Sequence, residues 1–387
     1  MDTKQFITDH LNDDVSELAL KYSNAKVDMT LALRQIEARQ LLRKKVPSWS
    51  DNDALLFPAR LSIEQCSSEA TAQYKASLLH GTTFADLTGG LGVDCHFISQ
   101  NFQHSDYVEA NPELCELARH NFALNEVNKR HIGIYNESAE DYLSHCAPLD
   151  CLFIDPARRD THGRKVVSIA DCTPNVVELQ DLLLKKAKKV MVKLSPMLDI
   201  SLALKELRHV KEIHVVAVEN ECKELLFIMA PDFNGKPVFT CVNLQSGQPA
   251  VIFSQDDEKA ASLMLAVALQ HYLYEPNAAI MKGGGYRLLC QRYNVQKLHR
   301  NSHLYTSENL INDFPGRIFE VDDWAVFGKK ASGLLDGIDK ASVAVRNFPM
   351  TVAELRKKFK IADGDQVYLF ATTLSDERRV VIRAHKN

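Results

Sequence analysis

The stretch Phe84-Ala85-Asp86-Leu87-Thr88-Gly89-Gly90-Leu91-Gly92-Val93-Asp94 decides the fold of this chain. Its apolar start is typical of a buried strand. The glycines predict a tight turn into a helix, because a residue without a Cβ lets the backbone pass close to a ligand. A second stretch, Tyr107-Val108-Glu109-Ala110-Asn111-Pro112, predicts another strand with a carboxylate at its carboxyl end. Together the two stretches predict a pocket for a nucleoside-bearing cofactor.

The chain around this pocket alternates short apolar runs with helical patterns from about residue 82 to 230, which predicts a doubly wound parallel sheet. The apolar runs are 84–86, 107–109, 132–135, 151–155 and 190–194. Two further runs, 213–218 and 224–229, are separated by only a few residues. So short a link forbids a parallel crossover and predicts an antiparallel pair. The expected fold class is therefore α/β, the Rossmann-like sheet of class I methyltransferases with an antiparallel last strand.

The spacing of the glycine turn favours S-adenosylmethionine over a dinucleotide. A dinucleotide fingerprint reads G-x-G-x-x-G and places a pyrophosphate on the helix N-terminus. Here Asp86-x-Thr88-x-Gly90-x-Gly92 is similar to the D-x-G-x-G-x-G pattern of methyltransferases, with Thr88 in place of one glycine. An acidic residue before the glycines would repel a pyrophosphate and suits the ammonium of a methionine moiety.

A carboxylate further along the chain fits the ribose of the same cofactor. Glu109 lies 17 residues after Gly92, a separation suited to binding the two ribose hydroxyls. The segment Glu137-Ser138-Ala139-Glu140 falls where the adenine edge is read. The predicted cofactor-binding residues are Asp86, Thr88, Gly89, Gly90, Gly92, Val93, Asp94, Glu109, Ala110, Ser138, Ala139 and Asp155. A glycine cluster alone is often only a turn, and Glu109 alone could be a helix N-terminal charge; their order and spacing favour the cofactor.

The predicted reaction site is Asp155-Pro156-Ala157-Arg158, which ends the fourth strand. Ligands of open α/β sheets bind outside the carboxyl ends of the strands. The segment resembles the (D/N)-P-P-(Y/F/W) motif of enzymes that methylate exocyclic amines, with Ala157 and Arg158 in place of the second proline and the aromatic residue. We expect Asp155, Pro156 and Arg158 to be catalytic. The Arg158 guanidinium could stack on a base or hold a phosphate, or it could pair with Asp160 or Asp171 at the surface.

The next strand ends at the same edge with Lys193-Leu194-Ser195-Pro196. We expect Lys193, Ser195 and Pro196 to shape the substrate mouth together with Gln65 of the N-terminal part. The alternative for the strand end is a solvated loop. Cys222 lies in the expected hairpin turn without a partner base, so direct methyl transfer is expected rather than a covalent intermediate.

The composition is that of an ordinary globular protein, with 387 residues, a formal net charge of −4 and 45% hydrophobic residues. The nine cysteines include no C-x-x-C pair, so we expect small buried thiols in a reducing cytoplasm. No apolar run approaches the ~20 residues of a membrane helix, and the N-terminus lacks a signal-peptide core. His299 and His303 have the spacing of a metal pair but no evident third ligand, so no metal is expected.

With these residues in place, the chain resembles the bacterial, Bacteroidetes-type class I methyltransferases that carry a C-terminal THUMP-like domain. The matching segments are Leu61-Ser62-Ile63-Glu64-Gln65-Cys66-Ser67-Ser68-Glu69, Thr71-Ala72-x-Tyr74-Lys75, Asp86-Leu87-Thr88-Gly89-Gly90, Asp155-Pro156-Ala157-Arg158-Arg159, Lys193-Leu194-Ser195-Pro196, Glu275-Pro276-Asn277 and Leu369-Phe370-Ala371-Thr372-Thr373. The resemblance covers nearly the whole chain. It implies S-adenosylmethionine as the cofactor and RNA (tRNA or rRNA) as the partner.

Four domains are expected. Residues 1–80 form an N-terminal helical domain that includes one helix from Ser62 to Leu79, started by a Ser62/Gln65 capping box. Residues 81–232 form the S-adenosylmethionine-binding domain. Residues 233–312 form an α+β module, ferredoxin-like or a linker, with a helix over 258–271. Residues 313–387 form the THUMP-like α+β module, with a helix over 351–359.

Local charge bears on the RNA partner. From Asp339 onward the chain contains ten basic and six acidic residues, a local net charge of +4 that suits phosphate binding. Tyr286, Tyr293 and Tyr305 lie among basic residues and could stack on RNA, or they could flank a core. Gly283-Gly284-Gly285 could form an anion-binding nest or a plain turn. The sequence thus predicts a cytoplasmic RNA methyltransferase acting on a base nitrogen. The alternatives are a methyltransferase of protein or small molecules and a non-catalytic RNA-binding protein; the sequence leaves the oligomeric state open.

Overall fold

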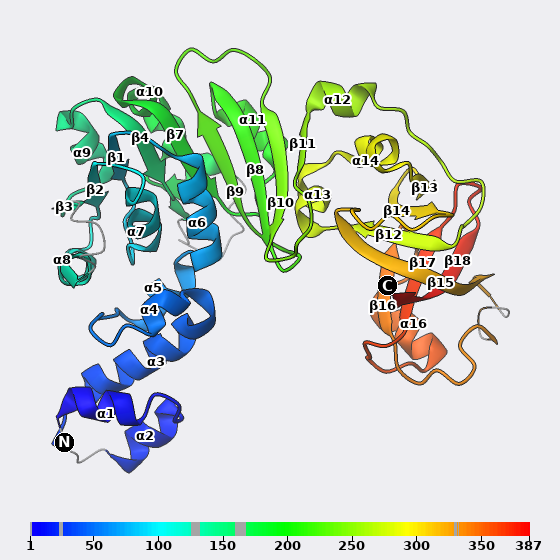
Figure 1. Cartoon of the computed structure of the whole chain (residues 1–387), viewed down its shortest axis with the longest axis horizontal. Helices are drawn as coiled ribbons and strands as arrows, with labels where there is room; N and C mark the ends of the chain where they lie inside the picture. The colour runs from blue at the N-terminus through cyan, green and yellow to red at the C-terminus, as the bar shows by residue number, and fades with distance from the viewer. Residues whose placement is uncertain (1, 23–25, 125–131, 159–167, 329–330, 332) are drawn as a thin grey trace. The chain divides into compact units, whose positions relative to one another are not determined.

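The computed structural model describes residues 2–22, 26–124, 132–158, 168–328, 331 and 333–387 (Figure 1). The chain forms two compact units. Unit 1 comprises Met1–Lys211 and Leu225–Gly235, and unit 2 comprises Glu212–Glu224 and Lys236–Asn387. Within the described ranges, no helix combines the length and the apolar character needed to cross a bilayer.

Unit 1 begins with six helices: α1 (Thr3–Asp9), α2 (Val15–Lys21), α3 (Met29–Lys45), α4 (Pro47–Ser50), α5 (Arg60–Gln65) and α6 (Glu69–Leu78). The first three each start at an aspartate whose side chain accepts backbone N–H groups of the first turn. The prediction of one helix from Ser62 to Leu79 is wrong. Ser62 lies inside α5 and does not cap it, whereas Ser68 accepts the Thr71 N–H and starts α6 as a new helix.

The sheet of unit 1 has the strand order β9-β7-β4-β1-β2-β3. Its strands are β1 (Thr83–Asp86), β2 (His104–Val108), β3 (Ile132–Tyr135), β4 (Leu149–Ile154), β7 (Ala187–Leu194) and β9 (Glu221–Met229). The five strands from β7 to β3 pair in parallel, and β9 runs antiparallel to β7. The predicted Rossmann-like sheet with an antiparallel last strand is confirmed.

Helices and short elements connect these strands. They are α7 (Val93–Ser99), α8 (Pro112–Leu124), α9 (Ala139–His145), β5 (Ala157–Arg158), the 3₁₀-helix η2 (Ile169–Asp171), β6 (Cys172–Thr173), α10 (Val176–Lys186) and α11 (Ile200–Glu206). β8 (Val210–Val218) precedes β9, and only Glu219 and Asn220 join them, both with positive φ. Such a pair makes the type I′ turn of an antiparallel hairpin, as the short link predicted.

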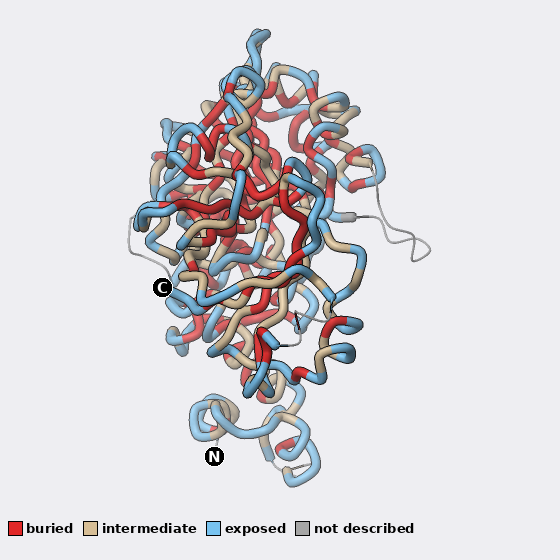
Figure 2. The backbone as a smooth tube through the Cα atoms, turned by 90° about the vertical axis from the view of Figure 1, so that its right-hand side faces the viewer, coloured by how far each residue is buried: buried red, intermediate tan, exposed pale blue. Residues whose placement is uncertain are grey.

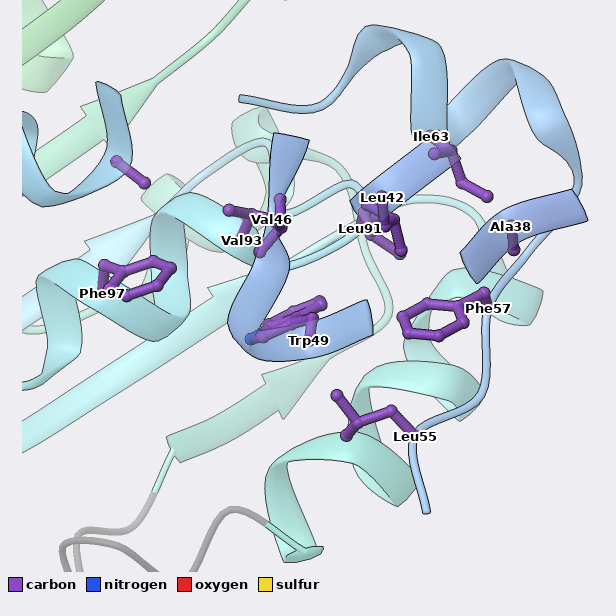
Figure 3. Packing of buried hydrophobic residues seen from close by; sticks show 11 residues of the cluster. Ala38, Leu42, Val46, Trp49, Leu55, Phe57, Ile63, Leu91, Val93 and Phe97 are labelled. Carbon is purple, nitrogen blue, oxygen red and sulfur yellow. The ribbon is translucent and has the colours of Figure 1, made fainter. Parts of the chain in front are cut away.

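A hydrophobic core joins the N-terminal helices to the start of the parallel sheet of unit 1. Leu91 and Val93, next to the glycine turn, pack with Leu42, Val46 and Trp49 (Figure 3). The first two helices are mostly exposed, with only Phe6 and Leu18 buried in them (Figure 2). The helical segment therefore shares its core with the turn that follows β1.

Unit 2 contains β8 paired in parallel with β10 (Val238–Leu244), and β11 (Val251–Ser254) antiparallel to β10. A seven-stranded sheet follows in the order β13-β14-β12-β15-β18-β17-β16. Its strands are β12 (Tyr272–Pro276), β13 (Gln296–His299), β14 (Ser302–Ser307), β15 (Gly316–Val326), β16 (Ser342–Arg346), β17 (Tyr368–Thr373) and β18 (Arg379–Lys386). Its helices are α12 (Gln255–Ala260), α13 (Ala278–Gly283), α14 (Tyr286–Tyr293) and α16 (Val352–Phe359).

Two helix predictions in unit 2 have different outcomes. The predicted Thr351/Glu354 capping box starts α16. The helix predicted over 258–271 is wrong, because a Ser254/Asp257 capping box starts α12 earlier and the helix ends at Ala260. The chain beyond it runs alongside β13, where the Ala266 N–H donates to the Lys297 carbonyl. A backbone partner outside the local sequence thus outweighs the helical pattern.

Gly283 is the last residue of α13, and the two glycines that follow it form a turn. Gly284 and Gly285 have positive φ, and α14 starts directly after them. The Glu258 carboxylate accepts the N–H groups of Arg287 and Leu288 at the start of this helix. The chain's own carboxylate therefore occupies the anion-binding position at this helix terminus.

Candidate active site

The glycine turn after β1 is shaped by Tyr107 of the neighbouring strand. The Gly89 N–H donates to the Val108 carbonyl at 2.9 Å, and a Cβ on Gly89 would collide with the Tyr107 ring. The Tyr107 hydroxyl donates to the Gly90 carbonyl at 2.6 Å. Gly92 has a φ of +89°, and a Cβ there would lie 2.9 Å from Phe122. Both the conformation and the space therefore require glycine.

Asp86 ends β1 and is completely buried. Its Oδ1 accepts the Thr88 N–H at 3.0 Å. Its Oδ2 accepts no hydrogen bond from any residue that the structure describes. Burial, followed by the nearby charge of Asp94, raises the pKa of Asp86 well above its usual range. Oδ2 of Asp86 is therefore a buried oxygen atom without a hydrogen-bond donor among the described residues.

Glu109 follows β2, the strand adjacent to β1, and is half-buried. Its Oε2 accepts the Gly90 N–H at 2.9 Å and its Oε1 accepts the Asn111 N–H at 2.8 Å. These bonds fix the carboxylate in one orientation. Each oxygen keeps a further lone pair, so the group can still accept hydroxyl donors.

Val93 and Asp94, predicted to bind the cofactor, start α7 directly after the turn. Val93 is buried in the core that the N-terminal helices share. Asp94 is 9% exposed, and its oxygens contact the Lys75 ammonium at 3.1 Å and the Ser67 hydroxyl at 2.7 Å. Burial acts to raise the pKa of Asp94, but the charges of Lys75 and Lys193 outweigh it and lower the pKa. This network ties α6 to α7.

The predicted adenine-side residues lie after β2 and β3. Ala110 is exposed, and Ala139 is buried in the first turn of α9. Ser138 caps α9, where its Oγ accepts the Asp141 N–H at 3.1 Å. Sequence reasoning missed Asn136, whose amide donates to the carbonyls of Glu109 and Ala110 at 2.9 and 3.0 Å. An amide directly after a strand at this edge was the available signal.

Asp155 directly follows β4, the strand on the other side of β1, and contacts two residues named in the prediction. Its N–H donates to Thr88 Oγ1 at 2.7 Å, and its Oδ2 lies 2.5 Å from Lys193 Nζ. Pro156 is buried beside it. The Arg158 backbone pairs with Cys172, but its side chain lies outside the described part of the structure, as do residues 159 and 160.

The predicted substrate residues are placed at the carboxyl ends of β7 and α5. Ser195 Oγ accepts the Met197 N–H at 3.2 Å, and Pro196 is half-buried. Gln65 is exposed as the last residue of α5. Burial raises the pKa of the adjacent Cys66 thiol to about 11, while the charges of Lys45 and Lys193 act in the opposite direction. Cys66, which follows α5, therefore lies close enough to Lys193 for the lysine charge to act on its thiol.

Sequence reasoning also missed the buried partners Ser67 and Lys75. Both lie in segments that matched the family resemblance, but a lysine on a helix reads as solvent-exposed. Lys75 is in fact completely buried. Among the residues that the structure describes, no cluster of three or more histidines, cysteines or carboxylates could hold a metal.

Comparison with known proteins supports the fold and the module order. Residues 272–315 match a ferredoxin-like domain, and residues 316–386 match a domain described as THUMP domain-like. The comparison with curated proteins gave no match. The solved "putative methyltransferase from Porphyromonas gingivalis W83" is 33% identical, with a TM-score of 0.87, over 99% of this chain and 97% of that chain.

A second solved structure, M. capricolum TrmK in complex with S-adenosyl-homocysteine, is 12% identical with a TM-score of 0.33. The match covers 42% of this chain and 68% of that chain, and it is too weak to support a conclusion. The P. gingivalis protein is different, since its identity to this chain extends over almost the full length of both. The chain therefore belongs to the same family, the class I S-adenosylmethionine-dependent methyltransferases with a C-terminal THUMP-like domain.

Proposed function

We propose that this protein transfers a methyl group from S-adenosylmethionine to a base nitrogen of RNA, and that the edge formed by β1, β2 and β4 is its active site. The observation that carries the proposal is the unpartnered Oδ2 of the buried Asp86. A buried acceptor without a donor costs about 1–3 kcal/mol, and more when it is charged. The ammonium of a methionine moiety would supply both the missing donor and the opposite charge.

The remaining cofactor contacts follow from the positions at the same edge. Glu109, oriented by two backbone donors, would accept the ribose hydroxyls. The backbone of Gly89, Gly90 and Gly92 leaves room for close approach. Ser138, Ala139 and Ala110 would border the adenine, and Thr88, Val93 and Asp94 would support the turn. When bound, S-adenosylmethionine supplies an electrophilic methyl group.

At the reacting end, Asp155 offers a carboxylate that is 35% exposed. It would accept hydrogens of an exocyclic amine and orient the nitrogen toward the methyl group. Buried Pro156 limits the motion of the segment. Lys193, Ser195, Pro196, Gln65 and Arg158 would border the substrate.

Unit 2 provides independent support for RNA as the substrate. It contains a groove of about 1060 Å³, here called the C-terminal groove, lined among others by His299, Arg300, Asn347, Phe348, Glu377 and Arg379. Arg300 and Arg379 are exposed, and neither forms an ion pair with a residue in the described ranges. Unpaired guanidinium groups beside an aromatic ring fit the phosphates and bases of an unpaired RNA strand.

The buried His299 holds the C-terminal groove in shape. Its Nδ1 accepts the Asn301 N–H and the Asn347 side-chain amide, at 3.0 and 2.9 Å, so its Nε2 carries the proton that is shared with Glu377. One imidazole thus joins three segments that line the groove. Since Glu377 is engaged by His299, its charge opposes the groove arginines less than an unpaired carboxylate would.

The tyrosines considered as an RNA platform pack inside unit 2. Tyr305 is completely buried and donates to the Tyr286 carbonyl. Tyr286 stacks on His303, and Tyr293 packs edge-on against Phe314. These tyrosines therefore flank a core, which was the alternative to an RNA platform. The proposed RNA surface is the C-terminal groove instead.

Nucleoside mass spectrometry of tRNA and rRNA from cells with and without this protein tests the function. The proposal expects one methylated nucleoside to be missing in the deletion strain and restored by the wild-type chain. An unchanged profile would instead favour a protein or small-molecule substrate. Cofactor binding without turnover on any RNA would favour a non-catalytic RNA-binding protein. Cytoplasmic localisation and the four-domain division remain predictions. All nine cysteines are free thiols, which is compatible with a reducing compartment.

A further inference from the structure

We propose that Thr88 and Lys193 are positioning residues that together fix the Asp155 carboxylate for the substrate. The inference rests on the proposed function, because it assigns roles within the same reaction. It differs from the sequence prediction, in which Thr88 contacts the cofactor and Lys193 contacts the substrate.

Thr88 connects the carboxylate of Asp86 to the backbone N–H of Asp155, at the ends of two adjacent strands. Its N–H donates to Asp86 Oδ1 at 3.0 Å, and its Oγ1 accepts the Asp155 N–H at 2.7 Å. One residue therefore spans the carboxyl ends of β1 and β4. A glycine at this position, as in the D-x-G-x-G-x-G pattern, would keep the backbone bond to Asp86 but would lack the side-chain bond to the Asp155 N–H.

Lys193 fixes the side chain of the same aspartate. Its Nζ lies 2.5 Å from Asp155 Oδ2, and the lysine side chain is only 13% exposed, so the contact is shielded from water on the lysine side. Charge-assisted bonds of this kind are about twice as strong as neutral ones. Asp155 is thereby held at its backbone N–H and at one carboxylate oxygen.

The other carboxylate oxygen is left for the substrate. Oδ1 of Asp155 accepts no hydrogen bond from a residue in the described part of the chain. An acceptor held on one side and open on the other suits a donor such as an exocyclic amine. A misplacement of about 1 Å in such a contact can lower the rate about 100-fold.

This arrangement also accounts for the departure of Asp155-Pro156-Ala157-Arg158 from the (D/N)-P-P-(Y/F/W) pattern. There, two prolines stiffen the segment from within. Here Ala157 replaces the second proline, and β1 and β7 supply the rigidity through Thr88 and Lys193. In both cases the carboxylate of the first residue of the motif is held in place, but here the residues that hold it follow or belong to the neighbouring strands β1 and β7.

Thr88→Val removes the hydroxyl at nearly constant volume, and Thr88→Ser retains it. With RNA from cells lacking the protein and methyl-labelled S-adenosylmethionine, Thr88→Val should lower kcat about tenfold, the effect of one lost hydrogen bond. Thr88→Ser should stay within about twofold of the wild type. Affinity for S-adenosyl-homocysteine should change less than twofold in both variants, since the bond to Asp86 comes from the backbone.

Lys193→Met removes the positive charge at nearly the same side-chain length, whereas Lys193→Arg keeps the charge and changes the shape of the head group. Lys193→Met should lower kcat at least about tenfold, while Lys193→Arg, which keeps a cation near Asp155, should recover most of it. Equal losses in the two variants would contradict the assignment of a charge-dependent role.

Hydrogen exchange of the Asp155 amide, followed by mass spectrometry, provides a reading that needs no substrate. Exchange should be faster in Thr88→Val than in the wild type or Thr88→Ser. If the wild type methylates no RNA, the proposed function fails, but this exchange comparison still tests the link. Unchanged exchange would overturn the inference. So would faster exchange with unchanged kcat, or a loss confined to S-adenosyl-homocysteine affinity.

Discussion

The Gly90 N–H donates a hydrogen bond to Oε2 of Glu109 over 2.9 Å, which ties the turn after β1 to the carboxylate after β2. The turn and the carboxylate are therefore one rigid element. A ligand that contacts the glycine backbone also meets an oriented acceptor. Truncation of Glu109 therefore removes both the oriented acceptor and the hydrogen-bond partner of the Gly90 N–H.

Glu109→Ala should weaken the binding of S-adenosyl-homocysteine by about 1–3 kcal/mol, through loss of charge-assisted bonds to the ribose. Isothermal titration calorimetry measures the change. Glu113→Ala is a matched control, because Glu113 is a solvent-exposed carboxylate in the first turn of α8. Equal affinities of Glu109→Ala and the control, in folded samples, would reject the ribose assignment.

Gly89→Ala should lower the free energy of unfolding by about 1–3 kcal/mol, because its methyl group overlaps the Tyr107 ring. Gly333→Ala should change it by less than about 0.5 kcal/mol, since the nearest atom to its Cβ lies 4.0 Å away. Urea denaturation of the three proteins gives the comparison. A Gly89→Ala protein as stable as Gly333→Ala would mean that the ring does not fill this space.

The raised pKa of Asp86 predicts a pH dependence of stability. The folded ligand-free protein binds this proton more tightly than the unfolded chain does. Its free energy of unfolding should therefore fall as pH rises from about 4, the usual carboxyl range, toward the raised value. Asp86→Asn lacks this contribution and should gain stability relative to the wild type as pH increases. Asp94, whose pKa is lowered, is ionised in the folded protein above the usual carboxyl range and adds no pH dependence of its own there.

Thermal unfolding of both proteins from about pH 5 to about pH 9 checks this expectation, since it covers the range above the usual carboxyl pKa. The difference in Tm, Asp86→Asn minus wild type, should increase across the range. A constant difference would show that Asp86 is ionised throughout.

Removal of the two groove arginines should weaken RNA binding without affecting the cofactor. Arg300→Ala combined with Arg379→Ala should reduce the slope of log affinity against log salt by about 1.4, or about 0.7 for each phosphate contact to a single strand. Lys259→Ala combined with Lys357→Ala removes the same charge from exposed positions that do not line the groove. Filter binding with unpaired RNA distinguishes them. The same slope in both double variants would place the RNA elsewhere.

The sequence predicted the elements whose signals are local. Glycine spacing and short apolar runs were enough for the parallel sheet, and the short link between the apolar runs 213–218 and 224–229 was enough for the hairpin. The capping box at Thr351 started the helix as predicted, because both partners lie within one turn. The residue types at the strand ends, Asp86, Glu109 and Asp155, identified one edge of the sheet.

Contacts between distant segments could not be predicted. The break between α5 and α6 depends on Ser68, which competes with Ser62 for the role of helix start, and propensity ranks the two equally. Lys75 is buried because Asp94, on another helix, supplies its counter-charge. The bond from Asp155 to Thr88 joins residues 67 positions apart, and no spacing rule connects them.

The central claim is that Asp86 and Glu109 hold S-adenosylmethionine at this edge of the sheet. Calorimetric titration of the folded wild type with S-adenosyl-homocysteine, in two buffers of different ionisation enthalpy, tests it most directly. The account predicts stoichiometric binding with release of a proton from Asp86, seen as a buffer-dependent heat that is absent in Asp86→Asn. No binding by the folded wild type, or equally tight binding by an Asp86→Asn, Glu109→Ala double variant, would contradict it.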